Sequence, residues 1–258
     1  MASILIRRPS GFIVGLIRGK TGKVLTGRHL FSSRNMASKD KFTNRIAKED
    51  DYNAIVNFLN ENFVPYEPTL TALNFRPNTP GMDLFWQSIA QCLIEPISFI
   101  SLNKQDEIVG SCLSSRFHPI SELDDRWTNR KVLPAGMSNF DIGVAYVSQL
   151  EDGLVECLAS KEQCNNPMLL NVLCVDSKFR GHGLGIKLID LAFDNSRQRG
   201  YDCIVSQATA KASQILFKRT GFDVLNVVKH EDFVNENGTR LLNCKDGTDE
   251  GQLVFKKL

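Results

Sequence analysis

Two periodicities of hydrophobic residues alternate along the chain from residue 43 onward. Apolar residues that recur every three or four positions predict helices, one from near Asp50 or Asp51 to Phe63 and others at 83–93, 181–199 and 210–220. Short apolar runs bounded by turn residues predict strands at 43–47, 97–102, 107–117, 169–175, 202–206, 222–228 and 252–256. Residues 118–165 are polar and irregular, apart from an amphipathic stretch at 142–158. This order of elements predicts a single α/β domain over 43–258.

Residues 1–39 differ in charge from the rest of the chain. They hold eight of the 31 Lys and Arg residues and none of the 29 acids, so residues 40–258 carry 23 bases against 29 acids, a net charge of −6. A basic, hydroxyl-bearing, acid-free N-terminus is typical of a mitochondrial transit peptide, and a disordered basic leader is the alternative. We therefore expect a mitochondrial or cytoplasmic protein. The acidic remainder argues against nucleic-acid binding.

The cysteine and histidine pattern indicates no metal site. Seven cysteines and four histidines show no ligand-like spacing, and most of the cysteines lie within apolar runs. Such cysteines are typical of reduced, buried thiols in an intracellular protein. No apolar stretch reaches the roughly 18 residues of a membrane span. The sequence leaves the oligomeric state open.

The most informative segment, at 172–186, joins a buried strand to a helix through a loop that contains Gly181, Gly183 and Gly185. Glycine permits positive φ and close approach of a ligand. The N–H groups at a helix start bind anions such as a diphosphate, and Arg180 adds a cation. The loop lacks the Gly-Lys-Ser/Thr of a Walker loop and fits a dinucleotide fingerprint poorly. A loop that only turns the chain is the remaining alternative.

The sequence Arg-Gly-His-Gly-Leu-Gly at 180–185 resembles the R/Q-x-x-G-x-G/A signature of the GNAT acetyltransferase superfamily. The likeness extends through the flanking strand and helix to Gly221-Phe222, and covers about residues 43–258. It implies a mixed, splayed central sheet flanked by helices, and acetyl-CoA as the acetyl donor. It also implies backbone contacts to pantetheine from the strand, at Leu173, Cys174 and Val175. The implied pyrophosphate contacts come from Arg180, Gly181, His182, Gly183, Leu184, Gly185 and Ile186.

Residues 62–69, Asn-Phe-Val-Pro-Tyr-Glu-Pro-Thr, resemble the N-F-x-x-x-E-P-L segment of the insect-type arylalkylamine N-acetyltransferases. An alkylamine must lose a proton before it attacks a thioester, so a base is needed. The resemblance implies that Glu67 is this general base. Pro65 and Pro68 predict a loop here, and a solvated loop acid is the alternative for Glu67. Thr69 departs from the usual Leu.

The resemblance also implies a catalytic part for two hydroxyl groups, those of Ser213 and Thr209, the latter in place of an expected serine. Helix capping by Thr209 and a polar helix face at Ser213 are the alternatives. Other family members protonate the departing thiolate with a tyrosine, whose position is Phe217 here. Cys174 lies in an apolar strand and is interpreted as a packing residue, not as a nucleophile.

The sequence thus predicts an acetyl-CoA-dependent N-acetyltransferase that acts by direct transfer on a small primary amine, with an arylalkylamine favoured. A polyamine or a protein N-terminus or lysine is the alternative acceptor. A CoA-binding module without catalysis is the alternative outside enzymes.

Overall fold

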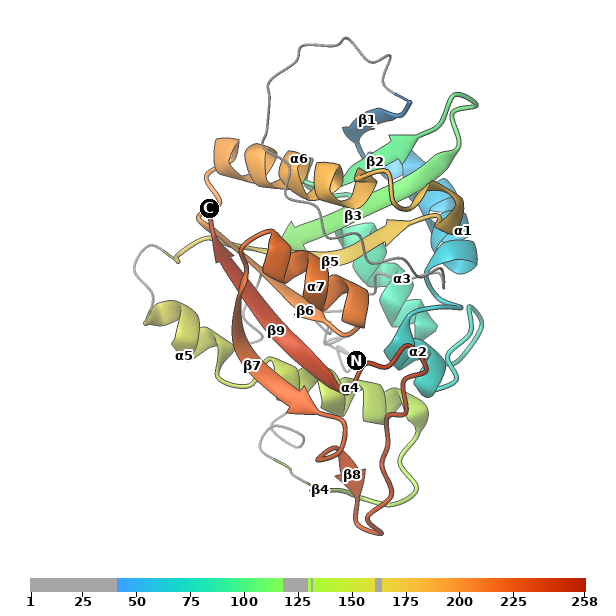
Figure 1. Cartoon of the computed structure of the whole chain (residues 1–258), viewed down its shortest axis with the longest axis vertical. Coiled ribbons are helices and arrows are strands. Elements are labelled where there is room, and N and C mark those ends of the chain that lie inside the picture. Colours follow the sequence, from blue (N-terminus) through green and yellow to red (C-terminus); the bar gives the residue numbers. More distant parts are fainter. Residues whose placement is uncertain (1–40, 118–129, 131, 161–163) are drawn as a thin grey trace, which may run out of the picture.

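The computed structural model describes residues 41–117, 130, 132–160 and 164–258, so the basic leader predicted at 1–39 lies outside the described residues. One seven-stranded sheet has the order β1-β2-β3-β5-β6-β9-β7 (Figure 1). Among the described strands of this sheet, β5 and β6 pair in parallel and the other neighbours pair antiparallel. The strands are β1 Thr43–Ile46, β2 Phe99–Leu102, β3 Ile108–Arg116, β5 Pro167–Val175, β6 Cys203–Ala208, β7 Asp223–Lys229 and β9 Glu250–Lys257.

Helices cover both faces of this sheet (Figure 1). On one face α6 (Leu184–Gln198) and α7 (Lys211–Arg219) pack against Leu173 and Val175 of β5. On the opposite face α1, α3 and α4 share a core with Val172 and Cys174. The remaining bounds are α1 Tyr52–Asn62, α2 Pro68–Ala72, α3 Met82–Gln91, α4 Asn139–Leu150, α5 Leu154–Ala159, and the two-stranded pair β4 Val132–Leu133 with β8 Val234–Asn235. The predicted mixed sheet flanked by helices is therefore present.

The sheet opens between β5 and β6. Their parallel pairing runs from Pro167↔Cys203 to Leu170↔Ser206 and ends there, although both strands continue. At the same level the register between β5 and β3 shifts, which leaves Asn171 as a bulged residue. A bulge bends and twists its strand, which moves the two strands apart. The splay that the resemblance implies is therefore present, and a bulge in β5 accompanies it.

Most predicted elements agree with the structure, and the differences have local causes. Pro68 does not simply break the chain but begins α2, since proline suits the first position of a helix. Helix α6 begins at Leu184 and not at residue 181, because Gly181 and Gly183 adopt positive φ. The amphipathic stretch at 142–158 belongs to α4 and α5, and part of the surrounding block, at 118–129, 131 and 161–163, lies outside the described residues. No helix in the described part of the chain is both long and apolar enough to span a membrane.

Candidate active site

The backbone of β5 has a free edge beyond the point where its pairing with β6 ends. The N–H of Asp176 donates to the carbonyl of Val109 on β3 at 3.0 Å. Because successive residues of a strand direct their N–H and C=O groups to opposite edges, Leu173 and Val175 direct theirs toward the gap beside β6. The backbone of Cys174 faces β3 instead. Of the three predicted pantetheine contacts, two therefore offer backbone groups to a ligand in the gap.

The loop after β5 presents a row of unpaired N–H groups. Gly181 and Gly183 have φ of +76° and +74°, and neither has another atom within 4 Å of where a Cβ would lie. Among the described residues, none accepts a hydrogen bond from the N–H groups of 181–186. The Lys187 N–H is the first to bond within the protein, to the Gly183 carbonyl at 3.0 Å. The helix start therefore has the geometry of an anion site.

Arg180 adds a positive charge at this loop. Its half-buried side chain donates from Nε to the Val175 carbonyl at 3.0 Å, which ties the guanidinium to the end of β5. Burial lowers the pKa of Arg180 from its ordinary value, but a guanidinium stays charged in proteins. The His182 and Ile186 side chains are exposed, whereas Leu184 is buried in the core under α6. The loop thus joins one fixed cation to the free N–H groups.

Glu67 is fully buried at the start of α2. Its Oε2 accepts from the Leu70 N–H at 2.6 Å, and its Oε1 accepts from the Thr209 hydroxyl at 2.9 Å. Burial raises the pKa of Glu67 to about 7, against the opposing effect of these hydrogen bonds and of the Thr69 backbone. The negative charge of Asp246 adds to the rise. A buried carboxyl with a pKa near neutrality is suited to proton transfer at physiological pH.

The two predicted hydroxyl residues have different partners. Thr209 follows β6 and reaches Glu67 from a position 142 residues further along the chain. The Ser213 hydroxyl instead donates to the Ala210 carbonyl at 2.8 Å and accepts from the Ala210 N–H at 3.3 Å. Ser213 therefore fixes the first turn of α7, directly after Thr209. Phe217 is fully buried and packs on Phe222.

The Glu67 segment lies against the end of β5. The Cys174 Sγ contacts the Asn62 carbonyl at 3.4 Å, and Tyr66 interacts electrostatically with Arg180, opposing the lowering of the Arg180 pKa. Burial raises the pKa of the Cys174 thiol to about 12, which keeps the thiol protonated at neutral pH and agrees with a packing residue. The base and the anion loop are thus parts of one region.

Sequence reasoning missed a buried pair near Glu67. The Tyr146 hydroxyl lies 2.9 Å from Nε2 of His230, and both side chains are buried. Burial raises the pKa of Tyr146 well above its ordinary value, and the charge of Glu67 contributes to the rise. Burial lowers the pKa of His230. The helical spacing from Ile142 places Tyr146 on the apolar side of its helix, but no pattern in the sequence indicates its histidine partner.

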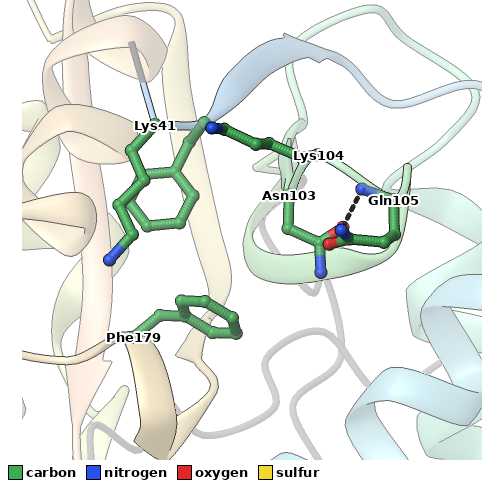
Figure 2. A pocket seen from close by; sticks show the side chains of 6 residues that line it. Lys41, Asn103, Lys104, Gln105 and Phe179 are labelled. Atoms are coloured by element: carbon green, nitrogen blue, oxygen red, sulfur yellow. Dashed lines mark hydrogen bonds between the residues drawn. The ribbon is translucent and has the colours of Figure 1, made fainter. Parts of the chain in front are cut away.

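A pocket of about 420 Å³ adjoins the anion loop on the side of β1 (Figure 2). Figure 2 shows Lys41 and Phe179 on one wall and Asn103 and Gln105, from the turn after β2, on the other. Phe179 immediately precedes Arg180, so the pocket brings cationic and aromatic surface next to the loop. Its lining residues are Lys41, Phe42, Asn103, Lys104, Gln105 and Phe179. Within the described residues, no group of three or more His, Cys, Asp or Glu could hold a metal ion.

Known proteins share this fold and part of this sequence. Residues 141–224 match the sequence model of the acetyltransferase (GNAT) domain. The structure is similar to arylalkylamine N-acetyltransferase 2 from Aedes aegypti, with a TM-score of 0.71 and 21% identity over 84% of this chain and 99% of that one. It is also similar to an agmatine N-acetyltransferase, with a TM-score of 0.71 and 18% identity over 85% and 100% of the two chains. A Drosophila melanogaster polyamine N-acetyltransferase is similar as well, with a TM-score of 0.68 and 18% identity over 84% of this chain and 100% of that one.

The chain therefore contains a GNAT acetyltransferase domain and has the GNAT fold, which confirms the predicted family and fold class. This domain uses acetyl-CoA, as predicted. The residues present fit acetyl-CoA. The unpaired N–H groups of 181–186 and the Arg180 guanidinium suit its diphosphate, and the open edge of β5 suits the amide groups of its pantetheine arm. Identities of 21% or less show the fold alone, so the acceptor and the roles of individual site residues stay predictions.

Proposed function

We propose that this chain is an acetyl-CoA-dependent N-acetyltransferase that acts on a small primary amine by direct transfer, with Glu67 as general base. The observation that carries the proposal is the position of Glu67, a fully buried carboxyl held by Leu70 and Thr209 beside the open end of β5. A solvated loop acid, the alternative for Glu67, does not agree with complete burial.

On the donor side, the chain supplies an anion site and hydrogen-bond donors. Acetyl-CoA brings an acetyl thioester. The N–H groups of 181–186 and the Arg180 guanidinium bind the diphosphate. The free N–H of Leu173 or Val175 is the donor for the oxygen on which negative charge develops during attack, and one such donor is typically worth about 3–4 kcal/mol.

On the acceptor side, Glu67 removes the proton. At pH 7 an alkylamine with an ordinary pKa is almost wholly protonated, a handicap of about 4 kcal/mol. A base with a pKa of about 7 is substantially ionised at this pH and is also acidic enough to release the proton afterwards. The hydrogen bonds to both carboxylate oxygens orient the base. Ser213 holds the first turn of α7, directly after Thr209.

Two acceptor classes are supported by different observations. The likeness of residues 62–69 to the insect-type enzymes supports an arylalkylamine, the class named for the Aedes aegypti protein. The net charge of −6 over residues 40–258 and a second buried carboxyl, that of Glu151, support an amine with more than one cationic group. The other two structures are named for agmatine and for polyamine acetylation.

The experiment is a steady-state assay with acetyl-CoA and a panel of amines, on the wild type and on Glu67→Gln. We expect kcat at pH 7 to fall by about 100-fold in Glu67→Gln, with the affinity for coenzyme A, measured by calorimetry, unchanged within about twofold. Glu61→Gln is the matched control, because Glu61 is an exposed acid on the same segment. Unchanged turnover in Glu67→Gln would remove Glu67 from the mechanism. Tight coenzyme A binding without turnover of any amine would indicate a binding module.

A further inference from the structure

A second buried carboxyl group lies on the face of the sheet that carries Glu67. Glu151 directly follows α4 and is only 4% exposed. Its Oε1 accepts a hydrogen bond from Nε2 of Gln207 at 2.5 Å. Gln207 lies on β6 and is 2% exposed, and its own Oε1 has no hydrogen-bond partner among the described residues. The pair therefore contains a buried acceptor that the described chain leaves unpaired.

This pair is next to the Glu67 site along the strand. Gln207 lies near the end of β6 and Thr209 directly follows the strand, so their Cα atoms are at most about 7 Å apart. Thr209 bonds Glu67, and Gln207 bonds Glu151. The pairing of β6 with β5 has already ended at Ser206, so both side chains lie beside the gap in the sheet.

A structural role alone accounts poorly for an acid at this position. Among the described residues, no cation pairs with Glu151. The residue lies at the C-terminus of a helix, where the partial negative charge of the carbonyl groups disfavours a carboxylate. Burial raises the pKa of Glu151 to about 8, so the group is mostly neutral at pH 7. Glutamine would keep the polar contact without the cost of an ionisable group.

We propose that Glu151 and Gln207 bind the second cationic group of a diamine whose first amine is deprotonated by Glu67. An ammonium group supplies both the N–H donors that Gln207 Oε1 lacks and the positive charge that a buried carboxylate needs. This inference rests on the proposed function and specifies its acceptor. The arylalkylamine class lacks this second cation.

The test compares matched amines on the wild type and on Glu151→Gln. Putrescine and cadaverine are paired with butylamine and pentylamine, which have the same carbon chains and no second ammonium. Glutamine mimics the neutral acid, so the variant keeps the contact with Gln207 and loses only the ability to become an anion. We expect kcat/KM for the diamines to fall at least tenfold, and kcat/KM for the monoamines to stay within twofold.

Calorimetry supplies a second readout without turnover. Binding of putrescine to the complex with coenzyme A should release a proton from Glu151 near pH 7, which is seen as a dependence of the binding enthalpy on the buffer. That release should be lost in Glu151→Gln and kept in Glu61→Gln. Gln207→Met removes the unpaired oxygen at similar volume and should lower the preference for diamines in the same direction.

The outcomes separate this inference from the proposed function. Equal losses for diamines and monoamines, or no change in their ratio, would overturn the diamine site and leave Glu67 catalysis intact. Failure of the wild type to acetylate any amine would instead reject the proposed function.

Discussion

The loop at 181–186 and the surroundings of Glu67 differ in their exposure to water and in the origin of their residues. The loop is one continuous segment in which Gly181, His182 and Gly183 are exposed, and its N–H groups have no acceptor among the described residues. Glu67 is fully buried, and its partner Thr209 comes from a distant segment. An anion site needs open N–H groups, whereas a base with a raised pKa needs removal from water. In the proposed site, an accessible half that binds the coenzyme would thus be combined with a desolvated half that transfers protons.

The largest effect is expected when substitutions disturb the loop at 181–186 and leave Glu67 unchanged. In Gly181→Ala/Gly183→Ala, left-handed backbone at two alanines costs about 1–2 kcal/mol each, so coenzyme A should bind about 100-fold more weakly. Isothermal calorimetry gives this affinity. Gly200→Ala is the control, because Gly200 has φ of +80° at the other end of α6 and an equally open Cβ position. Equal weakening in the control would attribute the effect to lost stability.

The second prediction concerns the desolvated half and the free energy of unfolding. The pKa of Glu151 rises from 4.5 to about 8 in the folded state, so its contribution to stability is fully present below pH 4.5 and is lost as the pH rises through 8. The upper bound of this loss in the free energy of unfolding is about 5 kcal/mol. We expect a loss of about 2 kcal/mol, because the protein around a buried ion relaxes and admits water. Urea unfolding should therefore show Glu151→Gln to be more stable than the wild type at pH 9 and similar at pH 4.5. Equal stability at pH 9 would show that Glu151 ionises without cost.

The third prediction sharpens the link between Glu67 and Thr209. In Thr209→Val the carboxylate of Glu67 loses a donor, so its pKa should rise and the acidic limb of the kcat/KM profile should move up by about one pH unit. The measurement is a pH–rate profile between pH 5.5 and 9, roughly spanning the pKa of the base. Ser213→Ala should lower the thermal midpoint without moving this limb, because Ser213 bonds the start of α7. A shifted limb in Ser213→Ala would place Ser213 in proton transfer.

The smallest effect is expected at the exposed rim of the loop. Lys104 lines the pocket beside Phe179 and is exposed, so Lys104→Ala should weaken coenzyme A binding by less than about threefold. Titrations at low and high salt should show this difference to vanish as screening increases. A salt-independent loss would indicate a direct contact and not a long-range attraction.

The sequence predicted the accessible half almost completely. The buried strand, the glycines and Arg180 are contiguous, so their chemistry and order are visible without any tertiary contact. Helix α6 begins three residues later than periodicity predicts, because the backbone of Gly183 leaves the helical region just before the helix starts. The short helix α2 was missed because five residues are too few for a periodic pattern.

By itself, the sequence predicted most of the helices and strands and the position of the glycine loop, because these depend on local periodicity and on glycine. It also marked Glu67 through a short likeness to known enzymes. Only the tertiary structure decided that Thr209 bonds Glu67 and that Glu151 meets Gln207 in a buried pair. Each of these hydrogen bonds joins residues more than fifty positions apart in the sequence. Such contacts, and the burial of the residues that make them, depend on how the whole sheet packs, and no local sequence pattern carries that information.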